Sequence, residues 1–172
     1  ATRQYWMKHF PESARRAIVL ADGIMKHRVL LFSDIVEFDG SIDWHLEYRS
    51  RKRAPLDFYR DIRGARVEAI GDLKNIWELN RHNFLMHLGK AHFATGDPAY
   101  YAKWRELILS WMDENPFNKG VNWESSIEVG IRAVNWIWSS YFFFDRLRED
   151  RELQERLCRH LHLHAEHVYN HL

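Results

Sequence analysis

Three side chains that can bind a ligand or transfer a proton lie close together at residues 77–82. Glu78 and Arg81 are three residues apart, and Glu78 and His82 are four apart, so a helix would bring them onto neighbouring turns of one face. They could then point together into one open site. The simpler interpretation is a surface ion pair, which contributes only about 0.3–0.5 kcal/mol to stability.

A second group of candidate binding residues follows further along the chain, where a loop leads into a helix. Asn122 and Trp123 lie in the loop, and Glu128 and Arg132 follow in the helix. The free N–H groups at a helix start favour an anionic ligand group, an indole can stack on a sugar ring, and amide and carboxylate groups suit hydroxyl recognition. Alternatively, Trp123 fills the core and Ser125 and Glu128 form a capping box. In that case Asn122 would only shape a turn.

Five histidines are clustered at residues 160–171. His160 with His164, and His167 with His171, have the i,i+4 spacing that lets two imidazoles share a metal ion. No carboxylate pattern of a known zinc enzyme accompanies them, so a solvated helix face is the simpler interpretation. We therefore expect neither a metal nor a cofactor.

Two further charged groups are weaker candidates. The basic run at residues 49–53 could bind a carboxylated or sulfated substrate, although such runs are more often solvated loops. Glu124 and Glu128 are four residues apart and could form a hydrolase acid/base pair. The capping role expected for Glu128 argues against that pair.

The composition is that of a folded soluble protein. The chain has 172 residues, with 46% hydrophobic and 28% charged residues, and 25 Lys and Arg against 24 Asp and Glu give a net charge of +1. Binding to a polyanion would therefore have to come from local patches of positive charge. We expect neither a nucleic-acid partner nor a membrane-spanning segment. The single cysteine, Cys158, cannot form an internal disulfide.

The helices that must position these residues can be predicted from hydrophobic spacing and capping signals. After a loose start, we expect helices at residues 13–28, 72–95, 98–115, 125–146 and 151–172. Residues 29–70 form an irregular wrapping segment with at most a short hairpin. The helix at 125–146 is apolar nearly all round, which predicts burial on most sides. Short connections make successive helices antiparallel, as in a bundle or an α/α toroid.

Taken together, these patterns predict an all-α chain that forms a single domain over residues 1–172. Aromatic residues make up 15% of it, and eight are tryptophan. We expect four of these to pack between helices: Trp104, Trp111, Trp136 and Trp138.

Several sequence segments, in order, resemble the N-terminal α/α-toroid domain of the heparinase II/III family of polysaccharide lyases. They are IDWH at 42–45, DLKNIWELNRH at 72–82, LGKA at 88–91, TGD at 95–97, GVNW at 120–123 and NWIW at 135–138. The match is colinear from about residue 44 to residue 172. It implies a partial toroid made of antiparallel helical hairpins.

The resemblance also implies a chemistry. Family members hold an acidic glycan in a cleft between the toroid and a β-sandwich domain and cleave it by β-elimination next to a uronic acid. That reaction needs a neutralised carboxylate and a Tyr or His that removes the C5 proton. In the family these catalytic groups lie in segments that follow the part matched here. We therefore expect this chain not to catalyse by itself, and we assign it no catalytic residue.

The resemblance implies a substrate-groove role for eight residues and places Trp44 and Trp77 near that groove. The eight are Glu78, Asn80, Arg81, His82, Asn122, Trp123, Glu128 and Arg132. The predicted function is the glycan-binding part of a bacterial lyase that acts on a heparin-, heparan- or alginate-like polysaccharide. The expected partners are that acidic polysaccharide and the remaining toroid and β-sandwich parts of the enzyme. The compartment is periplasmic or extracellular if a signal peptide was removed, and otherwise cytoplasmic.

Two alternatives stay open. An α/α-toroid glycoside hydrolase could use Glu78 and Glu128, which for an inverting mechanism would lie about 6.5–9.5 Å apart. The chain could also be a non-catalytic helical module that binds glycan or serves only as a scaffold.

Overall fold

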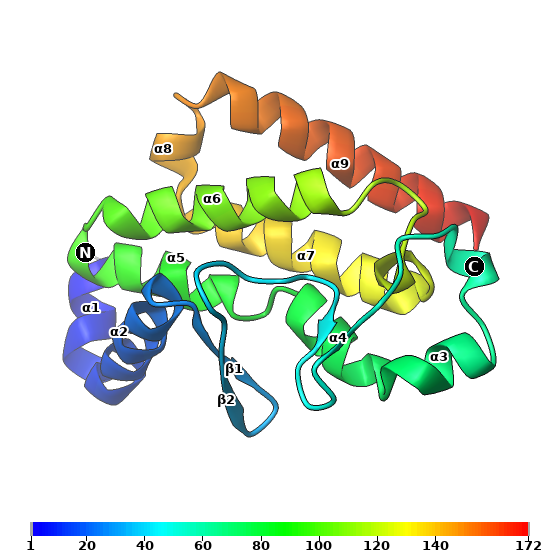
Figure 1. Ribbon diagram of the computed structural model, residues 1–172. Coiled ribbons are helices and arrows are strands. Elements are labelled where there is room, and N and C mark those ends of the chain that lie inside the picture. The colour runs from blue at the N-terminus through cyan, green and yellow to red at the C-terminus, as the bar shows by residue number, and fades with distance from the viewer. Residues whose placement is uncertain (1, 172) are drawn as a thin grey trace.

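A computed structural model describes residues 2–171 and is mainly helical, as predicted (Figure 1). Two short 3₁₀ turns, η1 (Tyr59–Asp61) and η2 (Val121–Trp123), lie in the connections. The helices are α1 (Thr2–His9), α2 (Pro11–Met25), α3 (Ala65–Ile70), α4 (Leu73–Asn80), α5 (Leu85–Thr95), α6 (Ala99–Glu114), α7 (Ser126–Phe142), α8 (Phe144–Leu147) and α9 (Arg151–Asn170).

The predicted short hairpin is present in the irregular segment. Strands β1 (Arg28–Leu31) and β2 (Asp34–Glu37) pair antiparallel, and a second small pair joins β3 (Leu46–Glu47) to β4 (Lys52–Arg53). The remaining residues between β4 and α4 wrap around one end of the helices (Figure 1). This wrapping brings η1 and η2 into contact although they are far apart in sequence.

Local capping signals mark several helix ends as expected. The Asp72 carboxylate accepts a hydrogen bond from the Lys74 amide at 3.0 Å and starts α4. Gly96 ends α5 in the left-handed conformation, with φ of 80°, which glycine adopts without steric cost. Asp97 accepts from the Ala99 amide at 2.8 Å where α6 begins. These three helix-end predictions are confirmed. They could be made from the sequence because each depends on groups only two to four residues apart.

Three predictions about helix extent were wrong. The predicted helix at 125–146 is divided at Phe143 into α7 and α8. The start of the chain is not loose, because residues 2–9 form α1, which packs on α2 and α5. The predicted helix at 72–95 is broken at residues 81–84 into α4 and α5. At the break His82 has φ of 61° and its ring is completely buried. Its Nδ1 accepts a hydrogen bond from Trp136 Nε1 at 2.6 Å, which a continuous helix would not place there.

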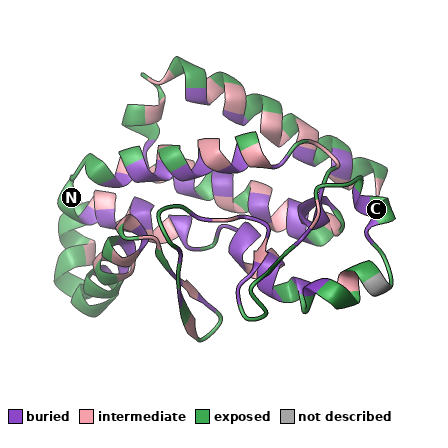
Figure 2. Ribbon diagram, viewed as in Figure 1, coloured by how far each residue is buried: buried purple, intermediate pink, exposed green. Residues whose placement is uncertain are grey.

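The core lies between α5, α6 and α7, with α2 packed on α5 and α9 packed on α7 (Figure 1). Buried residues follow the inner faces of these helices, and exposed residues lie on the outer elements (Figure 2). At Gly89, α5 approaches α7 so closely that an added Cβ would lie 2.7 Å from the Phe142 ring. Trp44, Trp104, Trp111, Trp123 and Trp136 are all fully buried in this core.

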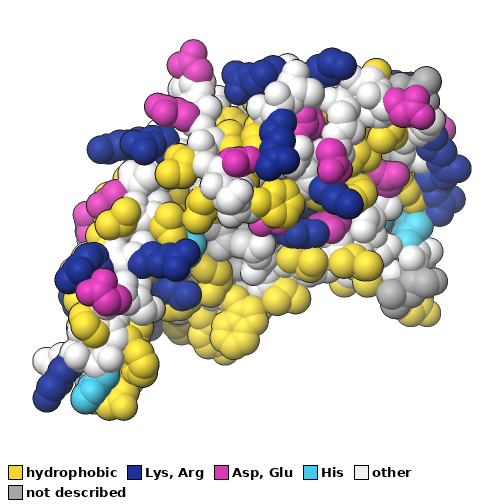
Figure 3. Space-filling model, turned by 90° about the horizontal axis from the view of Figure 1, so that it is seen from below, with side chains coloured by type: hydrophobic (Ala, Val, Ile, Leu, Met, Phe, Trp, Pro, Cys, Tyr) yellow, Lys and Arg dark blue, Asp and Glu magenta, His cyan; other side chains and the backbone are white. Residues whose placement is uncertain are grey.

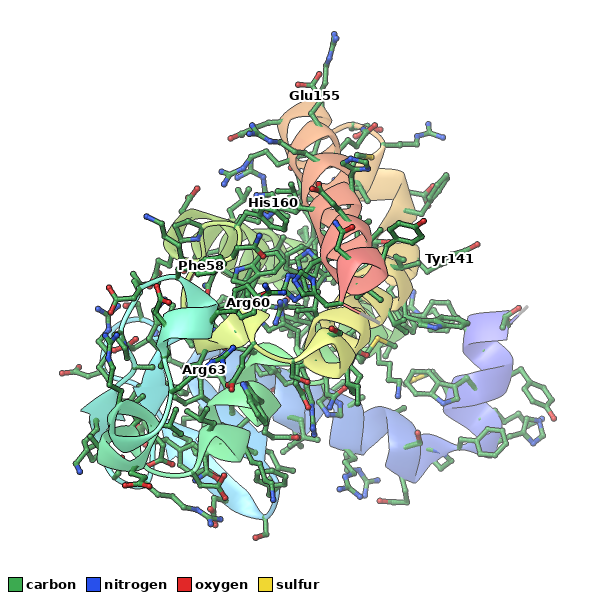
Figure 4. All side chains as sticks on the ribbon, turned by 90° about the vertical axis from the view of Figure 1, so that its right-hand side faces the viewer. Phe58, Arg60, Arg63, Tyr141, Glu155 and His160 are labelled. Carbon is green, nitrogen blue, oxygen red and sulfur yellow. The ribbon has the colours of Figure 1, made fainter. Side chains whose placement is uncertain are left out.

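The outer face of α7 differs from the prediction that this helix is buried on most sides. Trp138, which was expected to pack between helices, is 60% exposed, and Ile127, Val134 and Ile137 are exposed as well. Figure 4 shows Tyr141 pointing outward from the same helix. The helix is apolar nearly all round, but within residues 2–171 no element covers this face.

Candidate functional site

Arg81 joins two of the predicted site segments at the C-terminal end of α4. Its Nη1 donates to Glu78 Oε2 at 2.7 Å, and its Nε and Nη2 donate to the two Glu128 oxygens at 2.6 and 2.8 Å. The hydrogen bonds that Arg81 donates to Glu128 raise the pKa of Arg81 further above its usual value. The side chains of Arg81, Glu78 and Glu128 are 27%, 16% and 8% exposed. The three form a rigid ion cluster at the edge of the core.

The capping box expected at the start of α7 does not form. Ser125 is the N-cap residue, but among the described residues its side chain accepts no hydrogen bond from the first turn. Glu128 has turned toward Arg81 instead. A charge-assisted bidentate pair is stronger than a neutral cap, and only the packing of α4 on α7 makes it available.

Arg132 is fully buried one turn further along α7. Its Nε donates to His164 Nε2 at 2.9 Å, and its Nη2 donates to the Asn122 carbonyl oxygen at 3.0 Å. The guanidinium stacks over the Trp111 ring, 4.2 Å from its centre. No carboxylate in the described part of the chain pairs with it, and burial lowers the pKa of Arg132 to about 9.

The two side-chain amides among the predicted site residues, Asn80 and Asn122, form hydrogen bonds that stabilise the fold. Asn80 Nδ2 donates to the Trp44 carbonyl oxygen at 2.8 Å, and Asn80 Oδ1 accepts from Trp111 Nε1 at 2.7 Å. Asn122 Nδ2 donates to the Asn115 side chain at 2.8 Å and to the same Trp44 carbonyl at 3.2 Å. Both amides therefore anchor the irregular segment to the helical core.

The structure divides the eight predicted site residues into two sets. Glu78 and Arg81 are half-buried and form the predicted i,i+3 pair. The other six are buried: Asn80, His82, Asn122, Trp123, Glu128 and Arg132. His82 does not share a face with Glu78, because the chain leaves the helix at Arg81 and turns the His82 ring into the core.

An open groove that the sequence analysis missed lies where η1, α3, the start of α7 and the end of α9 meet. It has a volume of about 670 Å³. Its lining includes Tyr59, Arg60, Arg63, Glu124, Ser126 and His171. These residues come from separate segments, so spacing could not assemble them, although Arg60 and Arg63 are three residues apart in the irregular segment.

The family model described as Heparinase II/III N-terminus matches residues 8–171. The chain belongs to this heparinase II/III N-terminal family. A heparin-sulfate lyase of Bacteroides stercoris is 35% identical over 79 residues, which are 42% of this chain and 12% of that relative. No solved structure matches the chain significantly.

In this heparinase II/III N-terminal chain, two arginines of the basic run at residues 49–53 form ion pairs. Arg49 pairs with Asp34 at 2.7 Å and Arg53 pairs with Asp43 at 3.1 Å, both near the surface. Within residues 2–171, no three His, Cys, Asp or Glu side chains are grouped to hold a metal ion. No helix in that range has the length and apolar character to cross a bilayer.

Proposed function

We propose that this chain is the glycan-binding N-terminal part of a polysaccharide lyase that cleaves an acidic, uronate-containing polysaccharide by β-elimination. The observation that carries the proposal is the family match over residues 8–171, which contains all eight candidate site residues. The name of the Bacteroides stercoris relative, heparin-sulfate lyase, supports the same substrate class. This chain spans only 12% of that relative, so the complete activity is proposed for a longer enzyme.

In this proposal the eight residues divide their roles according to burial. Glu78 and Arg81 have exposed atoms and contact the sugar, whereas the six buried residues hold them in position. The cluster of Arg81 with Glu78 and Glu128 carries one positive and two negative charges. Such a cluster suits sugar hydroxyls, which donate hydrogen bonds to carboxylates, better than it suits a sugar carboxylate.

The chemical step itself needs groups from outside this chain. Elimination requires a neutralising group on the uronate carboxylate and a base within reach of the C5 proton. The predicted site residues do not supply that set, because Arg132, His82 and both amides are bound inside the core. We therefore assign this chain to substrate binding and not to proton transfer.

The hydrolase alternative is not supported by the geometry of its two carboxylates. A glycosidase needs one protonated carboxyl group as general acid and a second as base or nucleophile. Here Glu78 and Glu128 both accept hydrogen bonds from Arg81, so neither carboxyl group is free to act on a glycosidic oxygen or a water. The Arg81 side chain also stands between them, where the glycosidic oxygen would have to lie.

The exposed apolar face of α7 is proposed as the contact surface for further helices of the same enzyme, completing a toroid. The face carries Ile127, Val134, Trp138 and Tyr141 and adjoins a groove of about 380 Å³ between α7 and α9. Exposed apolar patches of this kind mark interaction surfaces. Elsewhere the surface mixes Lys and Arg with Asp and Glu, as the view from below shows (Figure 3).

The proposal is tested by separating binding from chemistry. The 172-residue chain is titrated with oligosaccharides from alginate, heparan and chondroitin, and binding is followed by tryptophan fluorescence and calorimetry. We expect binding without product formation. A silent titration with all three would favour a scaffold.

The longer parent enzyme is then incubated with the same polymers. We expect unsaturated uronate ends that absorb in the ultraviolet. New reducing ends without that absorbance would show hydrolysis and overturn the lyase proposal.

A further inference from the structure

The groove beside η1 presents two arginines without an ion-pair partner among the described residues, and the carboxylates of Glu68 and Glu124 also line it. Arg60 and Arg63 are exposed and line the groove, and neither forms an ion pair among residues 2–171. In Figure 4 both labels stand beside the start of α7. Unpaired guanidinium groups along a groove favour an anionic ligand.

A fixed chain of hydrogen bonds orients Arg60. The His171 Nδ1 donates to the His167 carbonyl oxygen at 2.6 Å, so in the neutral ring Nε2 is the acceptor. The Tyr59 hydroxyl, 2.6 Å away, donates to that Nε2 and accepts from Arg60 Nε at 2.9 Å. Because only Nε is engaged among the described residues, the two terminal nitrogens of Arg60 can bind a ligand. Their planar edge matches a carboxylate.

The rest of the lining suits the remainder of a sugar acid. Glu124 lies in the same groove, where burial raises its pKa and the charge of Arg63 opposes that shift. Its carboxylate can accept hydrogen bonds from sugar hydroxyls. Ser126 begins α7, whose first turn has no side-chain cap within the described chain, so the helix N-terminus adds positive potential.

We propose that this groove is a uronate-binding subsite in which Arg60 and Arg63 hold the sugar carboxylate and Glu124 accepts from its hydroxyls. The inference rests on the proposed function for the substrate class, but it concerns different residues from the Arg81 cluster. It supplies the cationic contact that the cluster, with its excess of carboxylates, does not provide. An unsulfated uronate fits best, since it offers a carboxylate and neighbouring hydroxyls together.

The test compares charge-removing variants of the full 172-residue chain. R60Q/R63Q removes both groove cations, R60K/R63K keeps the charges without the planar edge, and R15Q removes a cation from an exposed pair on α2. Each is titrated with an unsulfated uronate tetrasaccharide, a sulfated galactan oligosaccharide without uronate, and a neutral tetrasaccharide. Circular dichroism and thermal unfolding confirm that each variant is folded.

We expect R60Q/R63Q to weaken uronate binding at least tenfold, R60K/R63K to give an intermediate loss, and R15Q to stay within twofold of wild type. Equal binding of the sulfated galactan would show that the groove does not distinguish a carboxylate from a sulfate, and it would refute the uronate assignment. Unchanged uronate affinity in R60Q/R63Q would refute the subsite and leave the proposed function standing. A parent enzyme without eliminase product, but with binding lost in R60Q/R63Q, would refute the lyase proposal alone.

Discussion

Two completely buried histidines make the fold sensitive to acid. His164 Nε2 accepts the hydrogen bond from Arg132, and His82 Nδ1 accepts from the Trp136 indole. Each of these two nitrogen atoms must be unprotonated in order to accept its hydrogen bond. Burial, reinforced by the Arg132 charge, holds the pKa of both histidines well below the ordinary value.

The size of the stability loss in acid follows from the difference between the folded and unfolded pKa values of these histidines. Because the folded value is the lower one, protons bind preferentially to the unfolded chain, and stability is lost as the pH falls below about 6.5. Between pH 7 and pH 5.5 each histidine costs about 1.3 kcal/mol, or about 2.6 kcal/mol for His82 and His164 together. That is a large part of the 5–15 kcal/mol typical of a domain.

The assay is urea unfolding at pH 7 and pH 5.5, at equal ionic strength, followed by tryptophan fluorescence. We expect the free energy of unfolding of the wild type to fall by at least about 2.6 kcal/mol, since other partly buried histidines add to the effect. The variant H164Q keeps an acceptor for Arg132 but does not titrate. Its loss should be about 1.3 kcal/mol smaller than that of the wild type.

Two outcomes would refute this reasoning. One is a wild-type stability that is the same at both pH values. The other is an H164Q variant with the full wild-type loss, which would mean that His164 is not held neutral by its contact with Arg132.

Three further predictions concern packing and charge. Gly89→Ala should destabilise the chain by about 1–3 kcal/mol in urea unfolding, while Gly130→Ala, where an added Cβ meets nothing within 4 Å, should be neutral or stabilising; equal effects would contradict the close approach of α5 to α7. Arg81→Met should cost about 3 kcal/mol in thermal unfolding, because two carboxylates lose their shared cation. Trp138→Gln should change the stability of this chain by less than about 0.5 kcal/mol, whereas Trp136→Phe, which leaves a buried histidine nitrogen unpaired, should cost about 2 kcal/mol; a similar cost for both would mean that the Trp138 face is covered.

The sequence by itself determined the helical class, the hairpin segment and the family. Helix boundaries at Asp72, Gly96 and Asp97 could be predicted because their hydrogen bonds and backbone conformations involve only a few neighbouring residues. The Glu78–Arg81 pair was predictable for the same reason, since both residues lie on one helical turn. The family could be recognised because its motifs are colinear.

Only the tertiary structure decided what each polar residue contacts. Glu128 could have capped its own helix, but the packing of α4 on α7 brings Arg81 close enough to donate two hydrogen bonds to its carboxylate. His82 left its helical face because the core provides the Trp136 indole as a donor. The groove with Arg60 and Arg63 brings together segments that are far apart in sequence. Long-range partners compete with local ones at similar energies, so residue spacing could name the candidates without deciding which would be buried.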